Sequence, residues 1–341
     1  MIAFQKGINL GGWLSQCNHT KNRYETFITE EDFKRIAGWG FDHVRVPFDY
    51  NLLETDSGEL LDRNFEYLDR ALLWGKSHGL NVILDLHKTA GYDFNDFGNA
   101  ERNILFESDS AQERFLSLWD RVSKRYASRP NVAFELLNEV TDLSFVDPWN
   151  DLIVKAVRRI RQNAAETPII YGGVCWNSAA YVSKLVPPPA KNVIYTFHLY
   201  EPLLFTHQKA PWVKALDNGK DIPYTSDMEF FRKNSESLGF VGENLLRSNA
   251  KTMGPEFFAD FLREAITYAK SQNVPLYCGE YGVIDRADPD ETVKWFRDVH
   301  EVFKRFDIGS ALWSYKEMDF GFCGAHYAKL REFLGKSSHK D

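Results

Sequence analysis

Eight short apolar segments alternate with longer helical patterns along the 341 residues, and this alternation predicts a (β/α)8 barrel, the TIM-barrel class of α/β fold. A second observation supports the same fold: polar residues stand where the predicted strands end, which is where such barrels build their functional face. The length agrees too, because it is ordinary for an α/β barrel that carries an insertion. We therefore expect one domain over residues 1–341.

The predicted strands are short apolar runs bounded by turn residues. The segment 132–139 is representative: it follows Arg129, Pro130 and Asn131, and it ends in an amide and a carboxylate. A segment of the same design, 274–280, closes on a glutamate. The eight predicted strands cover residues 4–9, 43–47, 81–87, 132–139, 168–172, 192–200, 274–280 and 308–315.

Helical patterns follow these strands. The first begins at Thr29 and has three acidic residues in its first turn, a common helix start. The pattern over 110–126 places its aromatic and aliphatic residues on one face. The other predicted helices cover residues 62–78, 148–165, a short segment before 187, 256–272, 288–306 and 326–334.

The segment 201–255 breaks the helical rhythm. It is rich in aromatic residues, proline and glycine, and it is too long for an ordinary loop between a strand and a helix. We expect it to be an inserted subdomain between strand 6 and helix 6, lying over the functional face of the barrel. Its Trp212 is a candidate ligand-stacking residue.

Composition excludes several classes of partner. The net charge of -7 and the absence of a basic cluster disfavour nucleic acid and anionic membranes, and no apolar run is long enough to span a bilayer. The four cysteines lack CxxC spacing, so we expect reduced thiols. We expect a monomer. Nine tryptophans suit a protein that stacks flat, weakly polar ligand faces.

The N-terminus has neither a basic region nor the apolar stretch of a secretory signal. We therefore expect a cytoplasmic protein if this N-terminus is native, and a secreted one if a signal peptide has been removed.

Two glutamates carry the main functional hypothesis. Glu139 and Glu280 each end an apolar strand, and carboxylates are rarely buried unless they are paired. Strand ends in a barrel converge on one face, so the two acids are expected to share a site. Two carboxyl groups in one cleft are the minimal equipment for glycoside hydrolysis. The alternative is that each glutamate only caps its strand and faces solvent.

Other strand ends carry polar or aromatic residues as well. Considered alone, Arg45 is compatible with a structural salt bridge, His87 with a structural histidine and Trp313 with the core. Together with Asn138, His198 and Tyr200 they form a set that a sugar-cleaving site uses.

Other chemistries lack their motifs. The chain has no GxSxG elbow and no P-loop, and His300-Glu301 lacks the second histidine of HExxH. Asp85, His87, His198 and Glu280 could in principle bind a metal. However, we expect Asp85 to alternate away from His87 along the strand. We predict no metal and no other cofactor.

The motifs GINLGGWLSQ, FDHVRVPFDY, AFELLNEV, LYCGEYGVI and LWSYKEMDF occur together in this chain. With them, the sequence resembles glycoside hydrolase family 5, a cellulase-like group of retaining (β/α)8 glycosidases. The resemblance implies that Glu139 is the acid/base, Glu280 the nucleophile and Arg45 a support for Glu280. Sugar-binding roles are implied for Asn138, toward the 2-hydroxyl, and for His87, His198, Tyr200 and Trp313. One cleft wall is implied for Phe205, His207 and Trp212.

The resemblance further implies an endo-β-glucanase that acts on β-1,4 or mixed β-1,3/1,4 glucans, with a β-glucan polysaccharide or oligosaccharide as its partner. Three alternatives stay open: an exo-β-1,3-glucanase, whose family members share GINLGGWL, a β-mannanase or glucomannanase, and a barrel that binds carbohydrate without catalysis. Lys88 and Trp176 depart from the family pattern near the expected cleft, so the preferred sugar chain is undecided.

Overall fold

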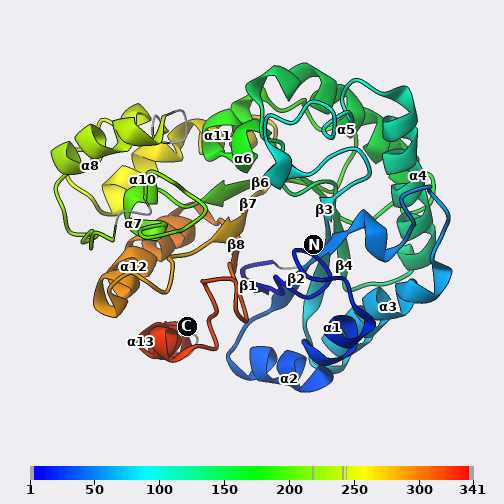
Figure 1. The fold of residues 1–341 in the computed structure, drawn as a ribbon, viewed down its shortest axis with the longest axis horizontal. Coiled ribbons are helices and arrows are strands. Elements are labelled where there is room, and N and C mark those ends of the chain that lie inside the picture. The colour runs from blue at the N-terminus through cyan, green and yellow to red at the C-terminus, as the bar shows by residue number, and fades with distance from the viewer. Residues whose placement is uncertain (1–3, 217–218, 240–241, 243, 338–341) are drawn as a thin grey trace.

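The computed structural model describes residues 4–216, 219–239, 242 and 244–337. Eight parallel strands form a closed barrel in chain order, and β8 pairs with β1 to complete the circle (Figure 1). The (β/α)8 prediction is confirmed. The strands are β1 (Lys6–Asn9), β2 (His43–Asp49), β3 (Asn81–Lys88), β4 (Val132–Glu135), β5 (Ile169–Gly172), β6 (Val193–Leu199), β7 (Leu276–Tyr281) and β8 (Gly309–Leu312).

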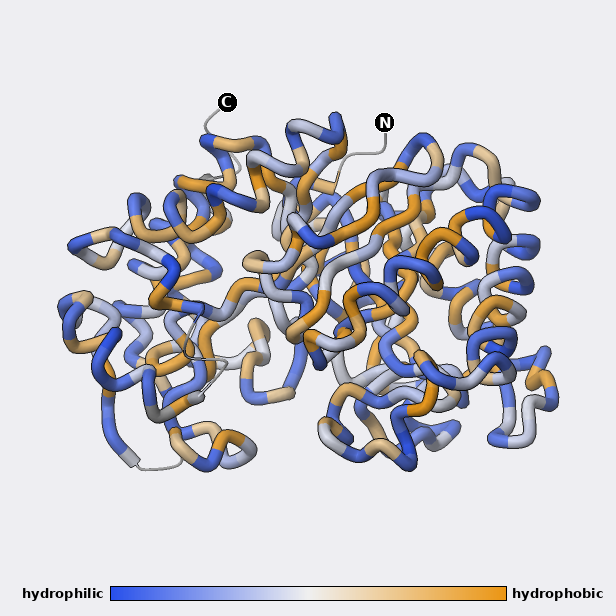
Figure 2. Tube along the Cα trace, turned by 90° about the horizontal axis from the view of Figure 1, so that it is seen from above, coloured by the Kyte–Doolittle hydropathy of each residue, from blue (hydrophilic) through white to orange (hydrophobic). Residues whose placement is uncertain are grey.

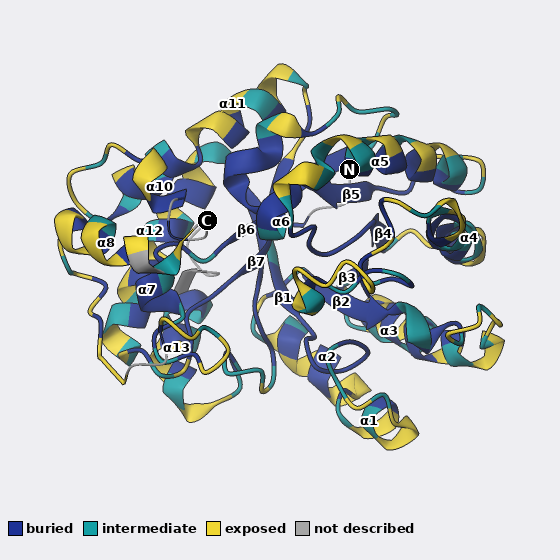
Figure 3. Ribbon diagram, turned by 45° about the horizontal axis from the view of Figure 1, so that its top comes forward, coloured by how far each residue is buried: buried dark blue, intermediate teal, exposed yellow. Residues whose placement is uncertain are grey.

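Helices surround the barrel and turn their buried faces toward it (Figure 3). In α12, the buried Trp295, Val299 and Val302 recur at helical spacing, which packs one face against the strands. The helices are α1 (Lys21–Thr26), α2 (Glu30–Gly38), α3 (Phe65–Ser77), α4 (Asp109–Tyr126), α5 (Val146–Arg161), α6 (Val174–Asn177), α7 (Leu203–Thr206), α8 (Met228–Ser235), α10 (Pro255–Phe261), α11 (Arg263–Ser271), α12 (Pro289–Phe306) and α13 (Ala328–Ser337).

Some boundaries differ from the sequence prediction. The helix expected over 256–272 is two helices, α10 and α11, which meet at Leu262. Strand β4 ends at Glu135, four residues before the predicted end. Beyond it the Leu136 N–H still donates to the Ile170 carbonyl on β5 at 3.0 Å, and the Asn138 N–H donates to the Leu86 carbonyl on β3 at 3.1 Å. Asn138 and Glu139 therefore stand at the end of β4 without being part of the regular strand.

In its described residues, the segment between β6 and α10 contains α7, α8 and two 3-10 turns, and it lies beside the barrel next to α12 (Figure 1). Tyr224 donates a 2.6 Å hydrogen bond to Asp298 of α12, which ties the segment to the barrel. Its Phe205 and Phe231 are fully buried, whereas Trp212 is 53% exposed. Residues 217–218, 240–241 and 243 of the predicted insertion lie outside the described residues. That 201–255 is a separate subdomain stays a prediction.

The barrel interior is layered. Phe4, Ile83, Ala133, Ile170, Ile194, Tyr277 and Ala311 form an apolar cluster inside the strands. Side chains two residues further along a strand point to the same side, and there the interior becomes polar, with Asp85 after Ile83 and Glu135 after Ala133. The rest of the core lies between the strands and the helices. Hydrophobic residues are concentrated there along the chain (Figure 2). Within the described residues, no helix combines the length and the apolar character needed to cross a bilayer.

Candidate active site

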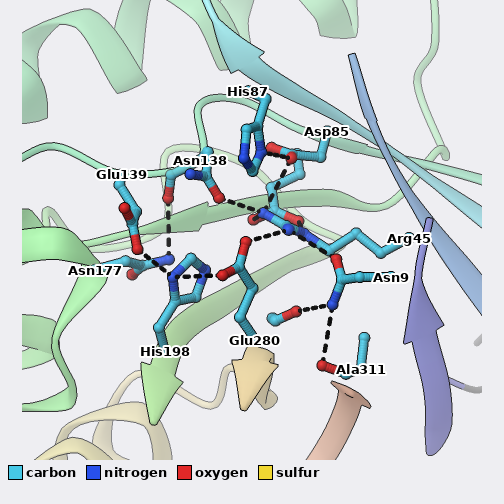
Figure 4. A network of polar contacts seen from close by, with 12 residues as sticks. Asn9, Arg45, Asp85, His87, Asn138, Glu139, Asn177, His198, Glu280 and Ala311 are labelled. Carbon is cyan, nitrogen blue, oxygen red and sulfur yellow. Dashed lines mark hydrogen bonds and ion pairs between the residues drawn. The ribbon is translucent and has the colours of Figure 1, made fainter. Parts of the chain in front are cut away.

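A buried guanidinium lies at the centre of the polar layer. Arg45, on β2, has no exposed surface. Its Nε and Nη2 donate to the two oxygens of Glu135 at 2.8 and 2.9 Å, and its Nη1 donates to Glu280 at 2.8 Å (Figure 4). Asn9 and Asn138 accept the remaining bonds through their Oδ1 atoms, at 2.9 and 2.8 Å. The guanidinium therefore orients side chains from β1, from β4 and its extension, and from β7.

More carboxyl groups than cations surround this centre. Asp85, Glu135 and Glu280 all lie within 3.1 Å of Arg45. Burial raises the pKa of Asp85 to about 7, and Arg45 opposes that rise. Burial also raises the pKa of Glu135. One positive charge cannot keep every one of these acids ionised in a low-dielectric interior, so part of the cluster carries protons near neutral pH.

The expectation that Asp85 points away from His87 is wrong. The two residues are two positions apart on β3 and therefore share a face of the strand. Asp85 Oδ2 lies 2.6 Å from His87 Nδ1. Burial lowers the pKa of His87 to about 3, so its imidazole is neutral at neutral pH. The ring stacks parallel to Trp313, with ring centroids 5.9 Å apart and 2° between planes. His87 and Trp313 thus line the cleft with their rings in parallel planes.

Glu280 is held from two sides. Arg45 Nη1 donates to its Oε1, and the Tyr200 hydroxyl donates to its Oε2 at 2.9 Å. Both donors stabilise a carboxylate, and together they fix its orientation at the end of β7. His198 Nδ1 lies 3.7 Å from the same Oε2.

Glu139 occupies a different environment. Burial raises its pKa to about 7, with Arg45 as the opposing charge. Its Oε1 lies 2.8 Å from His198 Nδ1. Burial lowers the pKa of His198 to about 4, so the ring that shares this hydrogen bond with Glu139 is neutral at neutral pH. Ligand atoms of Glu139, His198 and Glu280 all lie within 4.8 Å of one another. Glu139 is thus favoured as an acid, and its neighbour Glu280 is the carboxyl group that accepts from Arg45 and Tyr200.

Most of the predicted residues converge on one cleft of about 680 Å³. Arg45 lies beneath its floor. The expectation for Phe205 is wrong, because it is fully buried against Tyr224, with ring centroids 5.5 Å apart. Of the two residues that depart from the family pattern, Trp176 lines the cleft and Lys88 lies in a neighbouring hollow, paired with Asp93. The predicted residues that line the cleft are His87, Asn138, Glu139, His198, Tyr200, His207, Trp212, Glu280 and Trp313.

Sequence reasoning missed three residues of the polar layer: Asn9, Asp85 as a partner of Arg45, and Glu135. A signal for Glu135 was present, because a glutamate in the middle of the apolar run Val132–Leu137 must find a partner when the run is buried. Its partner is 90 positions away in sequence.

One group of side chains in the cleft has the spacing of metal ligands. Among the residues that the structure describes, Glu139, His198 and Glu280 are the group whose ligand atoms come close enough to hold an ion. His198 Nδ1 already bonds Glu139 Oε1, and Arg45 and Tyr200 bond the two oxygens of Glu280. These hydrogen bonds account for the close approach of the three side chains without an ion. A site without a metal stays our prediction.

Comparisons with known proteins agree with this geometry. The family described as Cellulase (glycosyl hydrolase family 5) matches residues 3–319. Endoglucanase C of Acetivibrio thermocellus is 39% identical over 329 residues, covering 94% of this chain and 93% of that protein. Cellodextrinase A of Ruminococcus flavefaciens is 39% identical over 304 residues, covering 89% and 83%. The resemblance seen in the motifs is confirmed.

Solved structures show the same similarity. Cel5A of Thermotoga maritima in complex with cellobiose is 25% identical with a TM-score of 0.73, and the match covers 98% of this chain and 97% of that chain. The same protein in complex with mannotriose has a TM-score of 0.72 at 25% identity and the same coverage.

The polar layer generates a stability prediction. Glu135→Leu leaves Arg45 buried without its bidentate partner, and breaking a buried ion pair typically costs about 3–5 kcal/mol of unfolding free energy. Glu135→Gln keeps an acceptor for Arg45, so we expect a smaller loss. Urea unfolding followed by circular dichroism measures both. Equal stability of the leucine variant and the wild type would contradict the role given to Glu135.

Proposed function

The chain belongs to glycosyl hydrolase family 5, and from this premise we propose that it is a retaining endo-β-glucanase that cleaves β-1,4 or mixed β-1,3/1,4 glucans. One observation carries the retaining assignment: an acid of raised pKa, Glu139, and a doubly supported carboxylate, Glu280, have oxygens within 4.8 Å of each other. Retaining glycosidases keep their carboxyl groups about 5–5.5 Å apart, whereas inverting enzymes leave roughly 6.5–9.5 Å for a water molecule.

In the first step, an oxygen of Glu280 attacks C1 of the sugar while the bond from C1 to the leaving oxygen breaks. Glu139 delivers its proton to that oxygen, so the leaving chain departs as a neutral alcohol. Burial of Glu139 suits it to this task because it keeps the proton available near neutral pH.

In the second step, water attacks C1 and the ester bond to Glu280 breaks. Glu139 now accepts a proton from the water. The charge on Glu280 is absent in the ester and returns as the bond breaks, so Glu139 ionises more readily in the intermediate than in the free enzyme. Over the catalytic cycle, Glu280 is thus uncharged while it is esterified, and this is the stage at which Glu139 ionises most readily.

The neighbouring residues have positioning roles in this proposal. Because Asn138 accepts from Arg45 through Oδ1, its amide group is oriented with Nδ2 left to donate, which suits contact with the sugar 2-hydroxyl. The parallel rings of His87 and Trp313 offer aromatic faces for the ring being cleaved.

The shape of the cleft supports internal cleavage. Phe97 and Trp176 pack together with ring centroids 4.9 Å apart, and they line the same cleft as Trp212 of the inserted segment. This aromatic surface, additional to the residues around the glutamates, suits a chain that extends past the cleavage point. Mannan or glucomannan is the second candidate, since Thermotoga maritima Cel5A has been solved with mannotriose. The exo-β-1,3-glucanase stays the other alternative, and comparing reducing ends with viscosity loss on one polymer distinguishes it.

Two variants test the assignment of the glutamates. Glu139→Gln keeps the side-chain shape without a transferable proton, so hydrolysis of β-glucan should fall by several powers of ten while β-cellobiosyl fluoride still forms the glycosyl-enzyme. Glu280→Gly should be inactive on both. Initial products read by proton NMR should be β-anomers. An α-anomer, or β-glucan hydrolysis by Glu139→Gln at the wild-type rate, would overturn the mechanism.

The pKa of Glu139 gives a pH prediction. The group acts as an acid in the first step and its pKa is about 7, so the protonated fraction is high below pH 7 and falls about tenfold for each unit above it. The kcat/KM for cellotetraose should fall accordingly. The kcat/KM for β-cellobiosyl fluoride should stay level, because fluoride leaves without a proton. If the kcat/KM values for the two substrates fell in parallel above pH 7, the loss of activity would be due to another group, such as Asp85.

Trp212 gives the third prediction. With half of its surface exposed in the cleft, it is available to stack on a sugar within one or two positions of the cleavage point. Trp212→Ala should raise KM for cello-oligosaccharides several-fold and change the melting temperature little. A lower melting temperature with unchanged kinetics would mean that Trp212 only anchors the inserted segment, through its edge contact with His207.

A further inference from the structure

Two polar atoms on β6 are buried without a hydrogen-bond partner among the described residues: Thr196 Oγ1 and His198 Nε2. Thr196 is fully buried and His198 is 4% exposed. The two residues are two positions apart on the strand, so their side chains lie on the same face. Buried polar groups nearly always have a partner, so two such atoms on one face indicate a small binding site.

Gly279, on the neighbouring strand β7, lies next to both atoms. The β6–β7 register shifts there, so that His198 pairs with Glu280 and Gly279 becomes the extra residue of a β-bulge. A Cβ added to Gly279 would lie 2.9 Å from Thr196 Oγ1 and 3.4 Å from His198 Nε2. The two atoms therefore flank the same point, and a larger side chain at this position would take up the space beside them.

The bulge is held by the network around Arg45. Asn9 Nδ2 donates to the Gly279 carbonyl at 2.9 Å, while Asn9 Oδ1 accepts from Arg45. The Cys278 thiol donates to the Glu280 carbonyl at 3.2 Å. The backbone beside the two unpartnered atoms is therefore positioned by the same guanidinium that supports Glu280.

The other ring nitrogen of His198 faces the two carboxyl groups of the proposed mechanism. Nδ1 lies 2.8 Å from Glu139 Oε1 and 3.7 Å from Glu280 Oε2 (Figure 4). Arg45 and Glu135 are the other charged groups that act on the ring. A neutral imidazole carries one proton, either on Nδ1 or on Nε2. The hydrogen bond made by Nε2 sets which nitrogen bears it.

This choice decides which oxygen of Glu139 carries the proton for the leaving group. When Nδ1 is protonated it donates to Oε1, and the acidic proton of Glu139 is left on Oε2. When Nε2 is protonated, Nδ1 accepts and draws the acidic proton to Oε1, where it lies between two side chains and away from the leaving oxygen. The productive arrangement therefore needs a hydrogen-bond donor to Nε2.

We propose that one water molecule binds between Thr196 Oγ1 and His198 Nε2 and donates to Nε2, and that Thr196 is thereby a positioning residue that keeps the proton of the ring on Nδ1. This proposal rests on the proposed function, which makes Glu139 the acid. Water suits the site because the site is buried and offers one hydroxyl and one ring nitrogen. One hydrogen of the water goes to Nε2, and Thr196 Oγ1 accepts the other.

The arrangement serves both steps of the reaction. Oε1 of Glu139 accepts from the ring whether the group is an acid or a carboxylate. The ring therefore keeps its own proton while Oε2 gives a proton to the leaving oxygen and later takes one from water. The bound water and Thr196 thus confine the proton transfer to one oxygen of Glu139.

Kinetics of three variants measure the contribution of the hydroxyl. Thr196→Val keeps the side-chain shape without the hydroxyl, and Thr196→Ser keeps the hydroxyl. Thr292→Val is the matched control, because it removes a buried hydroxyl of α12 that donates to the Asp288 carbonyl. We expect kcat/KM for cellotetraose to fall roughly tenfold in Thr196→Val, as for one lost hydrogen bond, less in Thr196→Ser and not in the control. The kcat/KM for β-cellobiosyl fluoride should hold in all three, because fluoride leaves without a proton.

Nuclear magnetic resonance locates the proton of the ring directly. In protein that contains isotope-labelled histidine, the nitrogen chemical shifts distinguish a protonated from an unprotonated ring nitrogen. The signals of His198 are those that disappear in His198→Asn. We expect Nδ1 to be protonated in the wild type at neutral pH, and a larger share of the ring to carry its proton on Nε2 in Thr196→Val. Thr292→Val should give the wild-type spectrum.

Crystals of the wild type should show one ordered water between Thr196 Oγ1 and His198 Nε2, and crystals of Thr196→Val should lack it. The inference is overturned if the wild type lacks this water or carries its ring proton on Nε2, if Thr196→Val leaves the ring or cellotetraose cleavage unchanged, or if it slows both substrates equally. Failure of the proposed function looks different, because the wild type then cleaves neither substrate. The water and the ring proton are observed without substrate and still test the site.

Discussion

The buried guanidinium of Arg45 is the interaction on which the site depends. A fully buried arginine must be paired and hydrogen-bonded throughout, and here its donors are satisfied by side chains from β1, β3, β4 and β7 or their extensions. The cost of burying the charge is offset only while all of these partners keep their places. The register of the strands therefore also sets the geometry of the catalytic residues. A shift of one strand would separate Arg45 from a partner and so disturb the support of Glu280.

This arrangement also explains why two chemically identical side chains behave differently. Glu280 receives hydrogen bonds from Arg45 and Tyr200, whereas Glu139 shares one with a neutral imidazole and lies deep enough for burial to raise its pKa to about 7. The neutrality of His198 matters, since a charged imidazolium between the two acids would favour ionisation of both. Burial, which lowers the pKa of His198 to about 4, prevents that.

The sequence predicted the features that depend on local pattern. Strand number, strand order and the residues at strand ends follow from apolar runs and turn residues, and Glu139, Glu280, His198 and Tyr200 were found in this way. Features that depend on distant partners were not found. In the sequence, Glu135 only interrupts an apolar run, and its role depends on the distant Arg45 that binds it. The burial of Phe205 likewise depends on Tyr224 from the same inserted segment. The end of β4 was missed because a hydrogen bond to β3 overrides the apolar pattern.

The two sides of the cleavage point are built by different means. Arg45, His87 and Glu280 lie on barrel strands, with shifts of ladder register beside His87 and Glu280. The Glu139 side is lined by irregular chain: Cys175, Trp176 and Asn177 all adopt left-handed backbone conformations, with φ of 60°, 55° and 54°. Such residues cost about 1 kcal/mol or more each. The fully buried Asn177 offsets part of that cost through its bonds to Gly173 and Asn138. Since the run 175–177 lies outside the barrel strands while Arg45 and Glu280 lie on them, the lining of this part of the cleft can change without moving the guanidinium that orients Glu280.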